Sequence, residues 1–545
     1  MPEAEATSRP LDGLAFDNRF TRELPGDPEP ANRIRGVHRA AFSRVLPAPA
    51  ARPVTLAFSS EVAALLRIDE ETCRSPDFAQ VFSGNRVPTG AEPFAACYGG
   101  HQFGSWAGQL GDGRAIALGE VFDRDGHHQT LQLKGAGLTP YSRHADGRAV
   151  LRSSVREFLC SEAMHHLGIP TTRALSLVTT GDAVVRDMLY DGNPQAEPGA
   201  VVCRVAPSFV RFGNFELPAS RDDRDLLRRL VDYTIRADFS ELLPASERGG
   251  AASKETIGRF FGEVCARTAR LLIDWMRVGF VHGVLNTDNM SILGLTIDYG
   301  PYGWLESFDA GWTPNTTDAG TRRYRYGAQP EIGGWNLMRL AQALLPLTDD
   351  PAPFQAGLDR YGALYFDGFH AVMTKRLGWG APRGEDDERL VGDLFRLLGR
   401  TETDQVLFFR ELASVPVDPE GRLTDDALLA PLTDAWYSPA EVTGELRAAY
   451  LTWLRAWSGR VRDGGLADGE RQRQMNALNP RFVLRNYLAQ EAIDAATSGD
   501  PSLIGELLDV LRHPYDEQPA RARFAARRPE WARHRVGCSM LSCSS

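Results

Sequence analysis

Lysine is scarce in this chain of 545 residues. It occurs only at positions 134, 254 and 375, although Lys and Arg together number 61. Arginine therefore carries almost all of the positive charge, and each lysine is a candidate for a specific role. Lys134 is the most informative of the three, because it directly follows an apolar, strand-like run.

Cysteines and long apolar runs are also few. The seven cysteines are spread thinly along the chain and form no CxxC pair, which argues against a disulfide framework and against a zinc cluster. No uncharged apolar run approaches the roughly 20 residues that a membrane span needs. Segment 1–27 lacks the apolar core of a signal peptide. We therefore expect a soluble, cytoplasmic protein that does not engage a membrane.

The charge balance shows no excess of basic residues. The 61 Lys and Arg are outnumbered by 71 Asp and Glu, so the net charge is −10. Without a global basic field, nucleic acid is not an expected partner. The length allows several average domains or one large two-lobed enzyme with extensions.

Polar side chains gather in the stretch 281–300. His282, Asp288 and Asn289 lie in a loop, and the apolar run 292–297 then leads to Asp298. Magnesium takes oxygen ligands, usually one or two protein groups together with phosphate oxygens. An Asn on a loop and an Asp at the end of the next strand would supply such groups, so the stretch predicts a metal-phosphate site.

The spacing of this stretch resembles the catalytic loop of protein kinases, H-R-D-L-x-x-x-N followed by D-F-G. His282 takes the first place, Asn289 the place of the metal-binding Asn, and Asp298-Tyr299-Gly300 the place of D-F-G. Val284 stands where kinases carry the Asp that accepts the substrate proton. Because valine cannot accept a proton, the site is expected to perform a different reaction.

A glycine-rich loop precedes two predicted strands. Gly111, Gly113 and Arg114 are followed by a strand over 115–122, a turn, and a second strand over 130–134 that ends in Lys134. Backbone N–H groups in such a loop can approach phosphate oxygens, and Lys134 occupies the place of the kinase strand lysine. A plain hairpin turn and a surface lysine on an edge strand are the alternatives.

A predicted helix follows an irregular segment that contains Asp146 and Gly147. Its apolar residues recur at helical spacing from Leu151 until Gly168 and Pro170 end it. Glu157 on this helix is the candidate partner of Lys134, and a solvent-exposed glutamate is the alternative. Further on, strands are expected over 174–178 and 201–206 and helices over 260–280 and 335–347, with a loop over 300–325.

Two arginines flank Pro207-Ser208-Phe209. Arg204 and Arg211 could together clamp phosphate groups. In a chain this rich in arginine, ordinary surface residues are the competing interpretation.

Five motifs together resemble the selenoprotein O family, protein adenylyltransferases with a protein-kinase-like fold. The resemblance extends from about Phe16 to the last residue. It implies an α+β, two-lobed fold with a β-rich N-lobe over 91–215 and a helical C-lobe over 216–470. Residues 1–90 would form an N-terminal extension and residues 471–545 a helical C-terminal one. The motifs are Tyr98–Gly104, Gln109–Arg114, Leu133–Gly137, Val281–Gly300 and Asn479–Tyr487.

The resemblance implies that ATP binds in a flipped orientation and that AMP passes to Ser, Thr or Tyr hydroxyls of protein substrates, with release of pyrophosphate. Mg²⁺ or Mn²⁺ is the implied cofactor, and UTP stays open as a donor. Lys134, held by Glu157, would bind phosphate, and Asp288 would accept the proton unless it only caps a turn. Asn289 and Asp298 would hold the metal. The implied nucleotide contacts are Gly111, Gly113, Arg114, Lys134, Asp146, Gly147, Arg204, Arg211 and Asp298.

Two other functions compete with adenylyl transfer. An atypical kinase would transfer the γ-phosphoryl group, which Val284 argues against. A noncatalytic ATP-binding scaffold would transfer nothing, which the retained Lys134, Glu157, Asn289 and Asp298 argue against. We expect a monomer whose substrates include proteins of redox metabolism. Cys543 stands where selenium-containing members carry selenocysteine. For Cys538 and Cys543 the alternatives are a redox pair, a link to another Cys, and inert terminal thiols.

Overall fold

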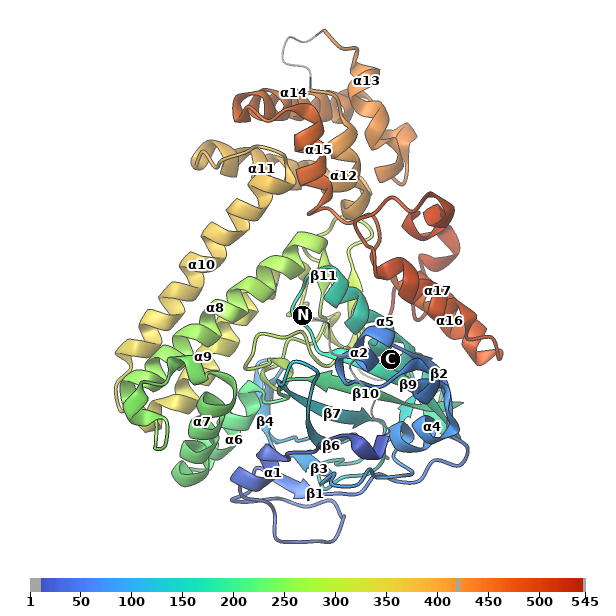
Figure 1. The fold of residues 1–545 in the computed structure, drawn as a ribbon. Coiled ribbons are helices and arrows are strands. Elements are labelled where there is room, and N and C mark those ends of the chain that lie inside the picture. Colours follow the sequence, from blue (N-terminus) through green and yellow to red (C-terminus); the bar gives the residue numbers. More distant parts are fainter. Residues whose placement is uncertain (1–10, 418–421, 543–545) are drawn as a thin grey trace, which may run out of the picture.

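The computed structural model describes residues 11–417 and 422–542 (Figure 1). It has a mixed α/β architecture, with a large antiparallel sheet in the N-terminal part and helices in the C-terminal part. This arrangement is compatible with the kinase-like fold expected from the sequence. None of the described helices combines the length and the apolar composition needed to cross a membrane.

The main sheet is antiparallel in every pair. Its strand order is β1-β3-β6-β7-β10-β9-β2, and β8 pairs with β10. The predicted strands β6 and β7 are confirmed, whereas β9 and β10 are much longer than expected and form a projecting hairpin. The strands are β1 Phe42–Arg44, β2 Val54–Phe58, β3 Phe94–Ala96, β6 Ala115–Phe122, β7 His128–Lys134, β8 Ala149–Val150, β9 Arg173–Arg186 and β10 Gln195–Ala206.

Both edge strands of this sheet come from the first 58 residues. β1 pairs with β3 and β2 pairs with β9. The same N-terminal segment forms α2 Ser60–Leu65, α3 Glu70–Arg74 and α4 Pro76–Ser83, and α4 packs on β9 and β10. The segment thus completes the sheet as well as covering it.

Helix α5 (Leu151–His166) covers the other face of the sheet. Val155, Phe158 and Leu159 are fully buried against it, as the helical spacing of apolar residues predicted. Burial of each such side chain stabilises the fold by about 1.5–3 kcal/mol. Gly168, with φ +76°, follows the last turn and ends the helix before Pro170.

Side-chain alternation along β7 separates the core from the site. Leu131 and Leu133 point into the apolar layer beneath α4, so Gln132 and Lys134 face the opposite side, toward α5. Arg204 on β10 is the register partner of Gln132. The pleat therefore brings Lys134, Gln132 and Arg204 to one face.

Helix α8 (Lys254–Val278) delivers the chain to the predicted polar loop. Ser253 caps its first turn by accepting a hydrogen bond from the Thr256 N–H, and Gly279, with φ +76°, ends it. α8, α9 (Gln329–Thr348) and α10 (Ala352–Arg376) pack side by side (Figure 1). α6 Phe212–Ser220 and α7 Arg224–Asp238 lie beside them.

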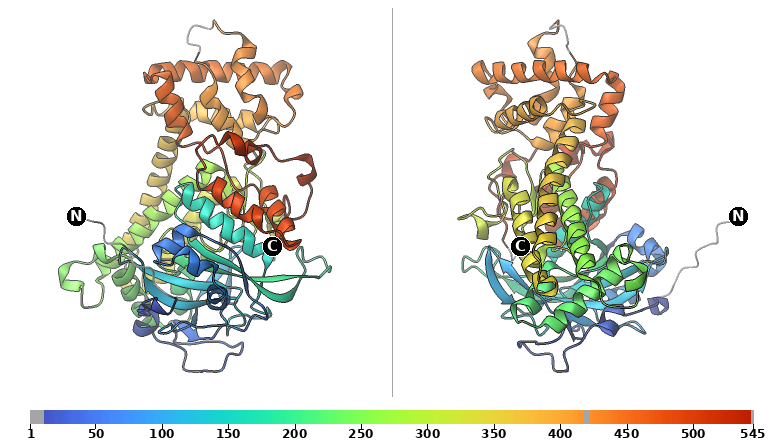
Figure 2. Two further views of the ribbon diagram at one scale, coloured as in Figure 1. Left: turned by 45° about the vertical axis from the view of Figure 1, so that its right-hand side comes forward. Right: turned by 90° about the vertical axis from the view of Figure 1, so that its left-hand side faces the viewer.

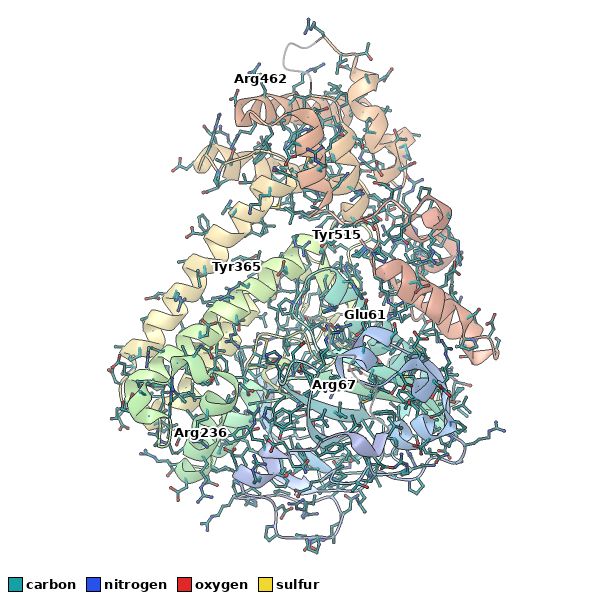
Figure 3. The ribbon with its side chains drawn as sticks, in the orientation of Figure 1. Glu61, Arg67, Arg236, Tyr365, Arg462 and Tyr515 are labelled. Atoms are coloured by element: carbon teal, nitrogen blue, oxygen red, sulfur yellow. The ribbon has the colours of Figure 1, made fainter. Side chains whose placement is uncertain are left out.

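The C-terminal helices form two groups. Figure 2 shows the first group at the end of the molecule remote from the sheet, and the second returns to pack on α5. Tyr515, labelled in Figure 3, helps to hold this return, because its hydroxyl donates to Leu167 O at 2.9 Å. The first group is α11 Glu385–Leu398, α12 Gln405–Glu411, α13 Asp425–Leu429, α14 Gly444–Gly464 and α15 Asp468–Asn476, and the second is α16 Asn486–Thr497 and α17 Ser502–Leu511.

One local prediction was wrong, and one hairpin was not predicted. The apolar run 292–297 forms no strand: Ser291 and Thr296 make only isolated bridges, because their partners are single residues of loops. The segment just before the glycine-rich loop was assigned no secondary structure from the sequence. It belongs to a hairpin, β4 Gly99–Gln102 and β5 Ser105–Gln109, in which Phe103 and Gly104 both have positive φ, as a tight two-residue turn requires.

Six of the seven cysteines are buried free thiols. Burial raises the pKa of the Cys538 thiol to about 11, so little of it is the reactive thiolate at neutral pH. Cys543 lies outside the described residues, so its pairing with Cys538 stays a prediction.

Candidate active site

A cavity of about 660 Å³ opens between the sheet, the β4–β5 hairpin and the polar loop after α8. Most of the residues singled out in the sequence line it, although they come from segments as far apart in the chain as Gly111 and Asp298. Glu157 and Gly147 are not part of the lining. Those that line it are Gly111, Gly113, Arg114, Lys134, Asp146, Arg204, Arg211, Asp288, Asn289 and Asp298.

Lys134 and Glu157 form a close ion pair. Lys134 Nζ lies 2.6 Å from Glu157 Oε2, with the lysine at the end of β7 and the glutamate buried on α5. Burial lowers the pKa of Lys134 below its usual value, and the charge of Glu157 opposes that shift. Neither residue is the surface side chain that was the competing interpretation. The glutamate fixes the ammonium group at the cavity wall.

Asp298 is surrounded by three cationic groups. Its Oδ1 lies 2.5 Å from Arg204 Nη1 and 4.0 Å from Lys134 Nζ, and its Oδ2 lies 2.9 Å from Arg211 Nη2. Burial alone would raise the pKa of Asp298, but Arg211, Arg204 and Lys134 outweigh it and hold the pKa well below the usual value. The two arginines are buried, so the interpretation of them as surface residues is wrong.

Asp112 supports this network from within the glycine loop. It was not predicted as a site residue. Its carboxylate accepts hydrogen bonds from Ala96 N at 3.0 Å and from Gln132 Nε2 at 3.2 Å, and it lies 3.4 Å from Arg211 Nη1. Burial raises its pKa, and Arg211 opposes that change. An acidic residue between two glycines was the available sequence signal, whereas its partners come from distant segments.

Asp288 lies in a short 3-10 turn, Thr287–Asn289, and its side chain is buried. Its Oδ2 accepts a hydrogen bond of 3.1 Å from Gln102 Nε2. Its Oδ1 has no hydrogen-bond partner among the described residues. Burial raises the pKa of Asp288 to about 7. A carboxylate with a pKa near neutrality and one unengaged oxygen is suited to accept a proton.

The β4–β5 hairpin packs directly on this turn. A Cβ atom at Gly100 would lie 2.7 Å from Asp288 Oδ1, so a larger residue would displace the carboxylate. The His101 N–H donates to Thr287 Oγ1 at 2.7 Å. Gln102 and Gly100 thus position Asp288, and sequence reasoning assigned a role to neither.

Donors for a divalent cation are present at the cavity. The Asn289 Nδ2 group donates to Val284 O at 2.8 Å, which leaves Asn289 Oδ1 as the free ligand atom. Asp298 adds a carboxylate. Oxygen donors of this kind suit Mg²⁺ or Mn²⁺. Asp298 is already engaged by Arg204 and Arg211, so it would share its charge between them and a metal.

Val284 and His282 belong to the kinase-like loop but are not proposed to accept a proton. Val284 lines the cavity at the position of the missing aspartate. His282 is buried, and its Nε2 lies 2.9 Å from Ile297 O, so it joins the polar loop to the segment before Asp298.

The glycine loop is held by close backbone packing. A Cβ atom at Gly111, where φ is +77°, would lie 2.4 Å from the Tyr141 ring. Gly147 supports the irregular segment, because a Cβ there would lie 2.2 Å from the backbone of Gly137. Asp146 at the cavity wall pairs with Arg186 Nη2 at 2.6 Å. Any nucleotide contact of Asp146 would therefore involve this pair.

Other lining residues were not predicted. Arg186 and Tyr190 come from the projecting β9–β10 hairpin, whose length the sequence did not indicate, and Arg143, His144 and Arg148 come from the irregular segment. Arg143, Arg148 and Arg186 add positive charge to the cavity lining, and Arg186 is paired with Asp146.

Comparison with known proteins agrees with the sequence motifs. A family model described as "Protein adenylyltransferase SelO" matches residues 31–512. Three curated relatives are each called "Protein nucleotidyltransferase YdiU". The relative from Aromatoleum aromaticum is 59% identical over 541 residues, which cover 98% of this chain and 100% of the relative. The relatives from Rhodopirellula baltica and Azoarcus sp. BH72 are 58% identical over 538 residues and 60% identical over 532 residues, and each match covers 98% of this chain and 99% of the relative. The resemblance drawn from the motifs is confirmed: the chain belongs to the SelO family of protein adenylyltransferases and is a protein nucleotidyltransferase.

Proposed function

We propose that the cavity binds ATP with its α-phosphate toward Asp288 and that AMP is transferred to a Ser, Thr or Tyr hydroxyl of a protein substrate. One observation carries the proposal. Asp288 Oδ1 is the only carboxylate oxygen described at the cavity that makes no hydrogen bond, and Val284, which cannot accept a proton, lines the same cavity. A γ-phosphoryl transfer in the kinase manner would need an acceptor at position 284.

The acceptor oxygen attacks the α-phosphorus as its proton passes to Asp288. The bond from the α-phosphorus to the bridging oxygen breaks, and pyrophosphate leaves with that electron pair. Such transfers depend on positioning and on neutralising phosphate charge. Lys134, Arg204, Arg211 and Arg114 supply positive charge at the cavity.

Asn289 and Asp298 would hold the divalent cation, Mg²⁺ or Mn²⁺. When bound, the cation would neutralise charge on the phosphates and orient them. Arg204 and Arg211, which share Asp298 in the structure, would then turn part of their hydrogen bonding toward phosphate oxygens. Gly111, Gly113, Asp146 and Gly147 would shape the nucleotide site around them.

The proposal includes the two-lobed kinase-like assignment. Residues 91–215, with the sheet and α5, would be the N-lobe, and residues 216–470 the helical C-lobe, with extensions over 1–90 and 471–545. The contacts of α5 with both the sheet and the C-terminal helices support an active arrangement of Lys134 and Glu157.

Incubation of the protein and a protein acceptor with Mg²⁺ and ATP labelled separately at the α or the γ position tests the function. We expect label on protein only from α-labelled ATP, with release of pyrophosphate. Label from γ-labelled ATP would indicate a kinase. No label from either, with ATP binding retained, would indicate a scaffold. Replacement of ATP by UTP in the same assay decides the donor.

The residue assignment has its own test. Asp288→Asn removes the proton acceptor and keeps the shape, so transfer should fall by about 10²–10⁴-fold while ATP binding is retained. Asp222→Asn is the matched control, because that side chain is 88% exposed and lies outside the cavity lining. Full activity of Asp288→Asn would exclude Asp288 as the base.

A further inference from the structure

A second hollow shares one lining residue with the cavity, at the tip of the β4–β5 hairpin. We call it the Arg323 groove; its volume is about 610 Å³. Phe103, at the turn of the hairpin, lines both the groove and the cavity. The two hollows therefore meet at this side chain. The lining is Phe103, Thr317, Thr321, Arg323, Arg325, Ala328, Glu331 and Ile332.

The guanidinium of Arg323 is positioned but not neutralised. It stacks over the Trp335 ring at 4.6 Å, and a Cβ at Gly104 would lie 3.3 Å from its Cζ. Its Nε and Nη2 are enclosed and have no hydrogen-bond partner within the described chain. No described acidic side chain forms an ion pair with it.

The backbone that carries Arg323 is fixed to the active site. Asp318 accepts hydrogen bonds from Arg323 N at 2.9 Å and from Tyr324 N at 2.7 Å. The Tyr324 hydroxyl in turn accepts from Phe103 N at 2.8 Å and donates to Asn286 Oδ1 at 2.5 Å. Asn286 lies two positions before Asp288. The groove and the proposed base thus belong to one hydrogen-bonded unit.

We propose that the Arg323 groove binds an acidic side chain of the protein substrate, close in sequence to the hydroxyl that receives AMP. A guanidinium that is held in place without a carboxylate partner favours an acidic side chain, because pairing compensates its charge. Arg325 adds a second positive charge, and Thr317 and Thr321 add hydroxyl groups. Glu331 is the only acid described in the lining, so the groove keeps a net positive charge. This inference rests on the proposed adenylyl transfer.

A peptide set tests the proposal with α-labelled ATP. Each peptide carries one Ser, Thr or Tyr acceptor, and one flanking position at a time holds Glu, Gln or Lys. We expect kcat/KM to be about tenfold higher for Glu than for Gln at one or two positions, and lower still for Lys. The preference should weaken as salt increases, because the groove is open to solvent.

Arg323→Gln should remove the preference for Glu and leave transfer to the Gln peptides near the wild-type rate. Arg325→Gln should weaken the preference in part and serves as the second variant if Arg323→Gln unfolds. Arg229→Gln, an exposed arginine on α7, is the matched control and should keep the full preference. Thermal unfolding of each variant reports on folding.

The outcomes are distinct. Transfer with equal rates for Glu and Gln peptides, or a full preference in both Arg323→Gln and Arg325→Gln, would overturn the groove assignment and leave the proposed function standing. If the wild type releases no pyrophosphate and labels no peptide or protein from α-labelled ATP, the proposed function fails and the groove assignment falls with it.

Discussion

The side-chain amide of Gln102 donates a hydrogen bond of 3.1 Å to Asp288 Oδ2, and it does so from a hairpin that lies 186 positions earlier in the chain. This contact orients the carboxylate so that its other oxygen, Oδ1, is left without a partner in the described structure. Gln102 therefore acts as a positioning residue for the proposed base.

Gln102→Leu should reduce kcat more than it changes KM for ATP. A hydrogen bond to a charged group contributes about 1.5–3 kcal/mol, so we expect a loss of kcat of roughly tenfold or more. Steady-state kinetics with α-labelled ATP measure both constants. Gln474→Leu, on the exposed face of α15, is the control and should leave both unchanged. A rise in KM with unaltered kcat would show that Gln102 only binds nucleotide.

Lys134→Met and Glu157→Gln should each lower transfer, and their effects should not add. The two groups meet at 2.6 Å, so once one is removed the other cannot perform its role. We expect at least a hundredfold loss for Lys134→Met, by analogy with other removed phosphate-site charges. Lys254→Met is the matched control, because that lysine is 63% exposed on α8. Strictly additive losses would show that the pair does not work as a unit.

Asp298→Asn and Asn289→Ala should both abolish metal-dependent transfer but differ in stability. Asp298 pairs with both Arg204 and Arg211, which are buried, so its loss removes a carboxylate partner from each of them. Each arginine keeps one other buried carboxylate, Glu157 at 3.2 Å for Arg204 and Asp112 at 3.4 Å for Arg211. Breaking a buried pair so that one charge is left uncompensated typically costs about 3–5 kcal/mol, and the remaining carboxylates should keep the cost below that range. Scanning calorimetry should show a clearly lower Tm for Asp298→Asn alone. Equal Tm values for the two variants would contradict the structural role of Asp298.

Asp238→Asn should stabilise the protein at alkaline pH relative to the wild type. The Asp238 side chain is 5% exposed, and burial raises its pKa to about 7, although Arg19 opposes the shift. An unfolded Asp titrates near pH 3.9, so between about pH 4 and 7 the folded state binds more protons and stability falls as pH rises. The Tm of Asp238→Asn minus that of the wild type should be more positive at pH 8.5 than at pH 5.

The control for this pH dependence is Asp222→Asn. Asp222 is an exposed carboxylate just before the start of α7, the helix that ends at Asp238. Its Tm difference from the wild type should be the same at both pH values. If the Tm difference between Asp238→Asn and the wild type is also the same at both pH values, the pKa of Asp238 is not raised in the folded protein.

Local signals predicted much of the fold. The strands β6 and β7 and the helices α5 and α8 follow from periodicity and from the Gly and Pro residues that end them. The β4–β5 hairpin was missed because its sequence is dominated by glycine and polar residues. The strand expected over 292–297 did not form, because apolar residues between two loops can be buried by tertiary packing without pairing with a neighbouring strand.

Motif spacing in the sequence by itself determined the family, the residue types of the site and the substitution of Val284 for the kinase aspartate. These features depend on residue identity and on short-range order along the chain. Only the tertiary structure decided which partner each charge has. Asp298 is shared by Arg204 and Arg211, Gln102 orients Asp288, and Arg323 has no described acidic partner beside the cavity. Such pairings join segments about 90 to 190 positions apart, and packing rather than local pattern brings those segments together.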